Sequence, residues 1–264
     1  MMGLFVALST AIGLALGSFA GVCVTRFDRP GQSPVTPRHS ACAACGARLA
    51  WYENVPVLSW LLLRGRCGHC GARIPARLLM IELTCGLWAG LLAWRLGPGA
   101  EWAVLLPLGV LLILVSFIDL ETFLLPDIYV LPGIAAAFAA AVLVLNHGTL
   151  WQRLSPALWG AGLGAGSFLA LHLVWKYGRR VDGLGLGDVK LMALIGALLG
   201  PWSLPFVAFG AAVAALPASL FWMRGPDGQG GRTAVPFGPF LSLAALAWVL
   251  GGDLLWARWL AWAA

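Results

Sequence analysis

Long apolar runs separated by short polar segments dominate the chain. A helix that crosses a membrane needs about 20 consecutive, mostly apolar residues. Runs near that length occupy 4–25, 78–96, 102–118, 128–145, 157–177, 202–223 and 237–252. One more run follows "GLGLGDVK" and reaches Gly200, where Pro201 is the only clear break before the next run. The pattern predicts an all-α polytopic membrane protein with about eight transmembrane helices.

Composition supports this class. Hydrophobic residues make up 60% of the 264 residues and charged residues 11%, whereas soluble globular chains carry about 25% charged residues. No Lys or Arg precedes the first apolar run, and no small-residue cleavage pattern ends it. We therefore expect that run to be a retained first span rather than a secretory signal.

The positive charges predict an orientation. Cytoplasmic loops are enriched in Lys and Arg near the ends of spans. With eight spans, all but three of the 17 Lys and Arg residues fall on one side, the exceptions being Arg95, Arg153 and Arg258. We expect that side to face the cytoplasm and both termini to lie outside it. The net charge of +6 then needs no nucleic acid to explain it, and the expected surroundings are membrane lipid.

The segment between the first two spans is the one long soluble loop. The expected organisation is a first transmembrane helix at 1–25, a cytoplasmic loop domain at 26–77 and a transmembrane domain at 78–264. A loop of this size needs a staple to fold. It contains two C-x-x-C pairs, at Cys42, Cys45, Cys67 and Cys70.

Four cysteines with this spacing can close a tetrahedral structural zinc site. Disulfides are the alternative, but the arginine count places the loop in a reducing cytosol, which favours zinc. His69, inside the second pair, is expected to be a bystander. Cys23 and Cys85 fall within spans, where a free cysteine behaves as a small hydrophobe.

Two aspartates stand at the membrane boundary. Asp119 follows the third apolar run, and Asp188 precedes the run that begins at Val189. The predicted topology puts both at the cytoplasmic face. Two carboxylates in a partly dry site share one proton, so one can act as a base and the other as an acid. The alternative is that both are interfacial caps or form salt bridges with Lys190 or a loop arginine.

Several segments together resemble the type IV prepilin peptidases, a family of membrane aspartyl proteases. "GLGLGDVKLMALIGALLG" looks like the family's G-x-G-D motif, and "DLETFLLPD" resembles its other aspartate motif. "ENVPVLSWLLLRGRCGHCGARIPARLLMIELTCG", "GSFAGVCVTR" and "VPFGPFLSLAAL" are also similar to family segments. The resemblance implies that Asp119 and Asp188 are catalytic and that the four cysteines bind zinc.

The resemblance also implies an activity. Family members remove the short basic leader of prepilins and pseudopilins at the cytoplasmic face of the bacterial inner membrane. Many also methylate the new N-terminus with S-adenosylmethionine. The sequence contains no Rossmann-type glycine fingerprint, so methyl transfer rests on the resemblance alone. Gly21 stands where the family usually has Asn, which weakens that half. Glu82 matches an acidic family position and is a candidate for the cofactor site or for polar lining.

Other interpretations remain open from the sequence. A small proton- or cation-coupled transporter would also carry intramembrane carboxylates, although the chain lacks the paired, interrupted half-repeats of such folds. A zinc metalloprotease would carry H-E-x-x-H, which is absent. Asp127 follows Pro126 at an expected helix start, where an acid suits the helix dipole. It and Glu121 are expected to be interfacial or to support the site from outside it.

Overall fold

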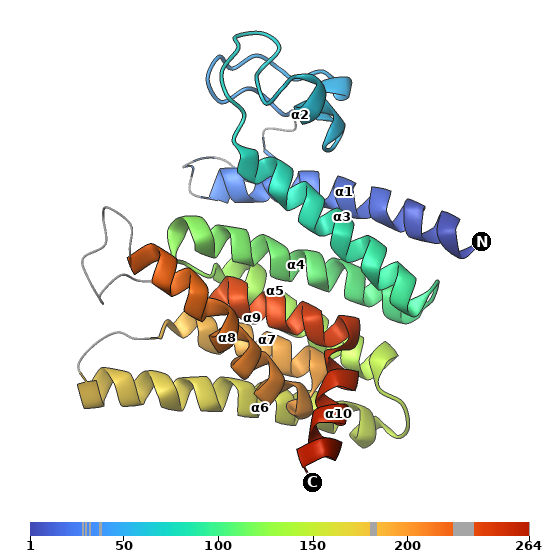
Figure 1. Ribbon diagram of the computed structural model, residues 1–264, viewed down its shortest axis with the longest axis vertical. Helices are drawn as coiled ribbons and strands as arrows, with labels where there is room; N and C mark the ends of the chain where they lie inside the picture. Colours follow the sequence, from blue (N-terminus) through green and yellow to red (C-terminus); the bar gives the residue numbers. More distant parts are fainter. Residues whose placement is uncertain are drawn as a thin grey trace. The chain divides into compact units, whose positions relative to one another are not determined.

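The structure is a computed structural model, and the regular elements of the part of the chain that it describes are helices (Figure 1). That part comprises residues 1–27, 29, 31, 33–36, 39–179, 184–223 and 235–263. Gly183, Arg38, Arg180, Arg224 and Arg232, used above in the motif and the charge pattern, lie outside it. The described residues contain isolated β-bridges and no longer strands. The all-α prediction is confirmed.

Among the described residues, seven helices are long and apolar enough to cross a membrane. They occupy Met2–Phe27, Ala76–Leu96, Ala100–Thr122, Asp127–Leu145, Leu150–Gly178, Pro201–Ser219 and Gly238–Trp259. The eighth expected span corresponds to α7 (Leu186–Leu199), which has only 14 residues. The break at Pro201 is confirmed, because the short helical turn η4 (Pro201–Ser203) separates α7 from α8 (Leu204–Met223).

The chain divides into two compact units, Met1–Phe117 and Ile118–Ala264. The first unit contains α1 (Met2–Phe27), the short helices η1 (Trp51–Asn54) and α2 (Leu58–Leu62), α3 (Ala76–Leu96) and most of α4 (Ala100–Thr122). In it α1 and α3 lie side by side (Figure 1). The buried Ser9 hydroxyl of α1 donates to the carbonyl of Ala89 in α3, at 2.8 Å.

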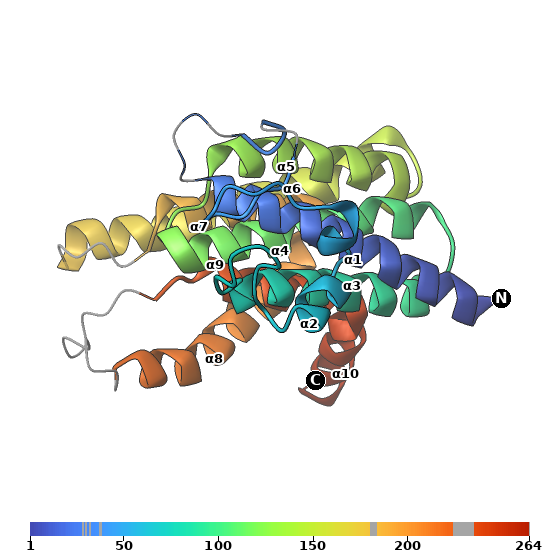
Figure 2. The same cartoon turned by 90° about the horizontal axis from the view of Figure 1, so that it is seen from above.

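The second unit is built around α7. Its other elements are α5 (Asp127–Ala140), η2 (Ala141–Leu145), α6 (Leu150–Leu173), η3 (Val174–Arg179), α8, α9 (Gly238–Ala247), η5 (Trp248–Gly252) and α10 (Asp253–Ala263). Helices α5, α6 and α9 pack against α7, and Figure 2 shows α5 and α6 close to it. Leu191, Leu194 and Ile195 of α7 are completely buried. This enclosure fixes the helix that carries Asp188.

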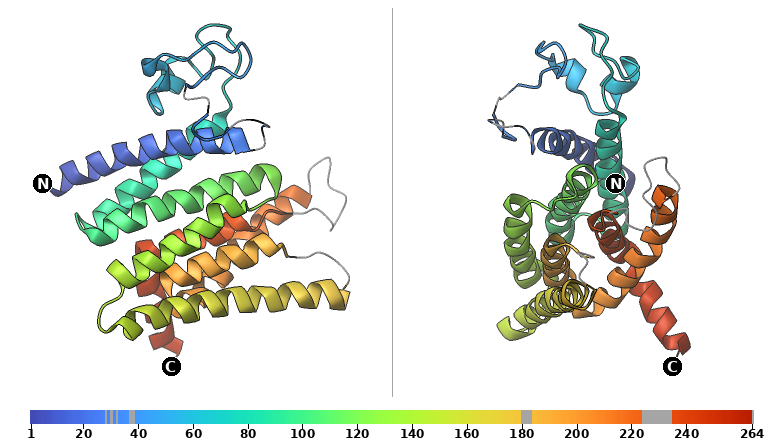
Figure 3. Two further views of the ribbon diagram at one scale, coloured as in Figure 1. Left: turned by 180° about the vertical axis from the view of Figure 1, so that it is seen from behind. Right: turned by 90° about the vertical axis from the view of Figure 1, so that its left-hand side faces the viewer.

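The backbones of α6 and α7 touch directly, and Figure 3 shows the two helices running alongside each other. A Cβ added to Gly160 of α6 would collide with the carbonyl of Gly196 in α7, and a Cβ on Gly196 would collide with Gly160. Small residues allow helices to approach this closely without a hydrophobic driving force. The position of α7 is therefore set by main chain against main chain, which leaves little room for it to shift.

Candidate active site and metal centre

Asp119 lies in the last turn of α4 and is 5% exposed. The sequence placed the end of this span at Ile118, and that boundary is wrong: the helix continues to Thr122. The apolar run stops at Ile118, but helical hydrogen bonds do not require apolar side chains. Phe123, at φ +55°, ends the helix while its N–H still donates to the Asp119 carbonyl. The helix therefore holds the Asp119 side chain rigidly.

Asp188 lies in the first turn of α7 and is 8% exposed. The helix begins at Leu186 rather than inward of Val189, so Asp188 is inside it. Its Oδ2 accepts the N–H of Gly185, the residue that precedes the helix, at 3.2 Å. Asp188 therefore caps the N-terminus of α7, in agreement with the alternative in which the two aspartates are interfacial caps. A cap of this kind uses one carboxylate oxygen and leaves the other available for chemistry.

The second unit brings both carboxylates to one region. The N–H of Gly238, the first residue of α9, donates to Asp119 Oδ2 at 3.1 Å. Leu125 lies next to both motifs: a Cβ added to Gly187 would be 2.8 Å from Leu125 Cβ, and one added to Gly238 would be 3.4 Å from Leu125 Cδ2. Two buried acids, each accepting a backbone N–H at the start of a helix, therefore lie in the same region around Leu125.

Neither aspartate is paired with Lys190. The Lys190 ammonium lies 2.6 and 2.8 Å from the two carboxylate oxygens of Asp127, at the start of α5. Within the described residues, no ion pair involves Asp119 or Asp188. The salt-bridge alternative with Lys190 is therefore wrong. Asp127 does begin α5, as the Pro-Asp pair predicted.

Sequence reasoning missed two residues of this region. Gly238 was noticed only as part of a family-like segment, although a Gly-Pro pair before an apolar run is a helix-start signal. His172, near the end of α6, is 8% exposed, and its Nδ1 lies 2.6 Å from the carbonyl of Leu184. That contact ties α6 to the segment leading into α7. No local pattern in the sequence pointed to it.

The four cysteines of the C-x-x-C pairs lie together. Their Sγ atoms are all within 4.8 Å of one another, and those of Cys42 and Cys70 are 3.9 Å apart. Zn–S bonds of about 2.3 Å in a tetrahedron would place sulfurs about 3.8 Å apart, so the donor set fits a four-thiolate metal site. His69 is outside this cluster. The predicted gathering of these cysteines is confirmed, and the cluster can hold a metal.

The two cysteine pairs have the same local fold for a reason visible in the sequence. Each is followed by Gly-Ala-Arg, in "CAACGAR" and "CGHCGAR". Gly46 and Gly71 both adopt φ +71°, and each donates its N–H to the first cysteine's carbonyl, Cys42 or Cys67. The backbone N–H groups of Cys45 and Ala44 lower the pKa of the Cys42 thiol to about 6. A lower pKa favours the thiolate, which is the form that binds metal.

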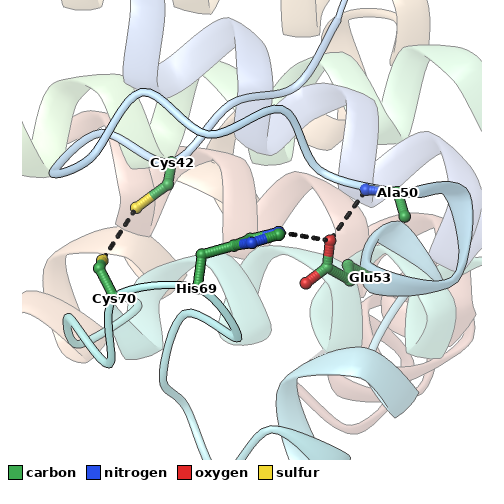
Figure 4. A network of polar contacts seen from close by, with 5 residues as sticks. All are labelled: Cys42, Ala50, Glu53, His69 and Cys70. Atoms are coloured by element: carbon green, nitrogen blue, oxygen red, sulfur yellow. Dashed lines mark hydrogen bonds and ion pairs between the residues drawn. The ribbon is translucent and has the colours of Figure 1, made fainter.

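Glu53 joins the second cysteine pair to η1 (Figure 4). Its carboxylate accepts the N–H of Ala50 at 2.9 Å and lies 3.6 Å from His69 Nε2. The Glu53 side chain is 7% exposed, and that of His69 is 52% exposed. A Cβ added to Gly68 would be 2.9 Å from Glu53 Oε1. Glu53 therefore orients the loop around the thiolates and does not belong to the metal-binding set.

Glu82, the candidate cofactor residue, belongs to α3 in the first unit and is half-buried. Its Oε2 accepts the N–H of Val57 at 2.7 Å. This carboxylate therefore connects a membrane helix to the cysteine loop. The sequence did not indicate that connection, because the two residues are separated by 25 positions.

Comparison with known proteins decides the family. Residues 11–96 match the Bacterial Peptidase A24 N-terminal domain and residues 106–220 match the Type IV leader peptidase family. A prepilin leader peptidase/N-methyltransferase from Pseudomonas putida is 37% identical over 96% of this chain and 93% of its own length. The chain belongs to the type IV leader peptidase family.

Further relatives agree with this assignment. A prepilin leader peptidase/N-methyltransferase from Stutzerimonas stutzeri is 33% identical over 98% of the chain and 95% of its own length. A type 4 prepilin-like proteins leader peptide-processing enzyme from Escherichia coli O78:H11 is 34% identical over 91% of each chain. No solved structure matches the chain. Nothing in the comparisons supports the transporter alternative.

Proposed function

We propose that this chain is an aspartyl endopeptidase of the bacterial inner membrane that removes the leader of type IV prepilins or pseudopilins at the cytoplasmic face. Membership of the leader peptidase family and the names of its relatives support the activity and the substrate class. The observation that carries the assignment to residues is the pair of buried carboxylates, Asp119 and Asp188, held on helix-start N–H groups in one unit.

The proposed reaction uses the two aspartates as one device. The ionised carboxylate takes a proton from a water molecule as the water oxygen attacks the scissile carbonyl carbon, while the protonated carboxyl donates its proton to the carbonyl oxygen. The tetrahedral intermediate then collapses, the C–N bond breaks and the leaving nitrogen takes a proton from a carboxyl. The Oδ2 atom of each aspartate accepts a hydrogen bond from a backbone N–H, so the Oδ1 atom of each serves the proton transfers.

Two cofactors belong to the proposal. Cys42, Cys45, Cys67 and Cys70 would hold a structural zinc ion, because four thiolates leave no open coordination position for catalysis. The N-methyltransferase activity in the relatives' names supports S-adenosylmethionine as a methyl donor. A basic leader that precedes an apolar helix would stay in the cytoplasm, which supports an active site on that face.

The decisive experiment replaces each aspartate with Asn, which is nearly the same size but cannot share the proton. Leader removal from a co-expressed pilin is assayed in membranes at matched expression. We expect Asp119→Asn and Asp188→Asn each to lose about 10²-fold to 10⁴-fold in rate, because that is the typical contribution of a general acid or base. The double variant should be no worse than either single variant, as for residues that act as a unit.

Asp127→Asn is the matched control. Asp127 is an acid of the same unit whose partner Lys190 is 39% exposed, and exposed ion pairs contribute at most about 1 kcal/mol. It should keep activity within about fivefold of wild type. Cleavage above about a tenth of wild type in either single active-site variant contradicts the dyad. Loss of cleavage on brief chelation, with the Asn variants still active, would instead indicate a metalloprotease.

A further inference from the structure

One side of α6 carries a stripe of buried residues spaced three or four positions apart. The stripe consists of Ala157, Gly160, Gly164, Phe168 and His172. Residues at this spacing lie on the same side of a helix, so the five form one continuous surface. Its glycines touch the α7 backbone, because a Cβ added to Gly164 would be 2.5 Å from the carbonyl oxygen of Met192. The other end of the surface, Phe168 and His172, has no part in the reaction described above.

His172 holds the peptide group that supports Asp188. Its Nδ1 lies 2.6 Å from the carbonyl oxygen of Leu184. A carbonyl oxygen only accepts hydrogen bonds, so Nδ1 carries the proton and donates. That carbonyl belongs to the same planar peptide as the N–H of Gly185, and this N–H donates to Asp188 Oδ2 at 3.2 Å. A series of hydrogen bonds therefore runs from the imidazole, through one peptide group, to the carboxylate.

The peptide between Leu184 and Gly185 needs this anchor. Gly185 is extended, at φ −74° and ψ +147°, and it precedes α7, so the peptide is not part of the helix. Glycine also has more backbone freedom than any other residue. The imidazole of His172 therefore fixes the chain where its own secondary structure constrains it least. Hydrogen bonds in a series polarise one another, so the same contact strengthens the hydrogen bond that Asp188 accepts.

Phe168 supports the donor to Asp119 through a ring contact. The rings of Phe168 and Phe237 are stacked, with centroids 6.4 Å apart and an angle of 30° between their planes. Phe237 is the residue before α9, and the N–H of the next residue, Gly238, donates to Asp119 Oδ2 at 3.1 Å. The Phe237 carbonyl in turn accepts the N–H of Phe240. The peptide that supports Asp119 is thus held by α9 at its carbonyl and by α6 at the neighbouring ring.

We propose that Phe168 and His172 are positioning residues for the peptidase reaction. Helix α6 carries neither aspartate, yet two side chains one helical turn apart orient the backbone donors of both. This inference rests on the proposed function, since it requires Asp119 and Asp188 to act on the substrate. Both positioning residues act through a backbone peptide, so we expect their substitution to lower kcat and to leave KM unchanged. A histidine that only stabilises the fold would not show this pattern.

The test measures kcat and KM for leader removal from a purified prepilin by the full-length enzyme in detergent. His172→Phe keeps a ring of similar size and removes the donor. We expect kcat to fall about threefold to about tenfold with KM unchanged, as for the loss of one hydrogen bond between neutral groups. His172→Asn places an amide N–H close to the position of Nδ1, so it should recover the wild-type kcat. This recovery requires the donor and not merely the filled space.

Phe168→Leu tests the second contact. It keeps an apolar side chain in the buried position and removes the stacked ring. An aromatic pair contributes beyond its buried area, and we expect kcat to fall about twofold to about tenfold with KM unchanged. His147→Phe and Phe209→Leu are the matched controls, because both side chains belong to the same unit and are exposed. Both controls should have the wild-type kcat.

Asp188→Asn, assayed in parallel, separates the inference from the proposed function. If Asp188→Asn keeps the wild-type rate, the assignment of the reaction to the aspartates falls and the inference falls with it. If Asp188→Asn loses cleavage while His172→Phe keeps the wild-type kcat, only the inference is overturned. It is also overturned if His172→Asn is no faster than His172→Phe. A lower thermal midpoint in both His172 variants, with wild-type kcat per folded enzyme, would show that the histidine only stabilises the fold.

Discussion

Replacing Gly238 with alanine tests whether the start of α9 positions Asp119. A Cβ at Gly238 would lie 2.7 Å from Asp119 Oδ2, and real Cβ contacts essentially never fall below 3.0 Å. Either the carboxylate or the helix start must therefore move, and the hydrogen bond of 3.1 Å from the Gly238 N–H is lost. The substitution changes the geometry of the site without removing any titratable group.

The magnitude follows from that hydrogen bond. A hydrogen bond to a charged group contributes about 1.5–3 kcal/mol, and each 1.36 kcal/mol corresponds to tenfold in rate. We therefore expect Gly238→Ala to cleave about tenfold to about 150-fold more slowly than wild type. Displacement of a catalytic group by about 1 Å can by itself cost about 10²-fold, which agrees with the upper part of this range.

Leader cleavage in membranes at matched expression is the assay, and Gly162→Ala is the control. Gly162 lies in α6 of the same unit, and a Cβ there meets nothing within 4 Å. Its cleavage rate should equal that of wild type. Gly238→Ala with more than about half of wild-type activity would refute the positioning role. If the amount of the Gly238→Ala protein in the membrane fell as much as its cleavage rate, the cause would be a folding defect and not a change in the position of Asp119.

Two further predictions concern the cysteine loop and the orientation. Purified protein should contain one zinc per chain, and the double change Cys42→Ser and Cys45→Ser should remove the metal and unfold the loop. Less than about half an equivalent of zinc in a well-folded wild-type preparation would contradict the metal assignment. Full zinc content in the double variant would contradict it as well. A reporter inserted between Cys45 and Cys67 should behave as cytoplasmic, and a reporter at the C-terminus should behave as external, because the loop carries the excess of arginine. The reverse pattern would place the aspartates on the wrong face for a basic leader.

The sequence predicted the helices well and their ends poorly. Apolar runs reveal the spans because lipid leaves the chain few other options. The boundary at Asp119 was wrong because a hydrogen-bonded helix continues past the last apolar residue. Hydropathy alone predicts that the short α7 is a span. Its close packing against α6 depends on the contact between Gly160 and Gly196, and two glycines in separate apolar runs give no sign that they will meet.

The candidate site was predictable in its acids and thiolates and unpredictable in its supports. Two aspartates at membrane boundaries are rare enough to stand out, and a doubled C-x-x-C has few other uses in a reducing compartment. The donor to Asp119 is 119 residues away, at Gly238. The connection from Glu82 to Val57 requires a strained turn at Val57, at φ +62°, that no propensity would suggest. Tertiary packing creates both contacts, and the local sequence does not predict them.

The shortness of α7 has a consequence for the lipid around the enzyme. Its 14 residues give a length of about 21 Å at 1.5 Å per residue, whereas the hydrocarbon layer is about 30 Å thick. About 9 Å of depth is left that this helix does not cross. Since α5, α6 and α9 pack around α7, this depth lies at its ends, where headgroups and water can reach inward. Asp188 stands at one of those ends. Hydrolysis consumes water, so if Asp188 is catalytic as proposed, we expect the thickness of the host membrane to affect the rate of the peptidase reaction.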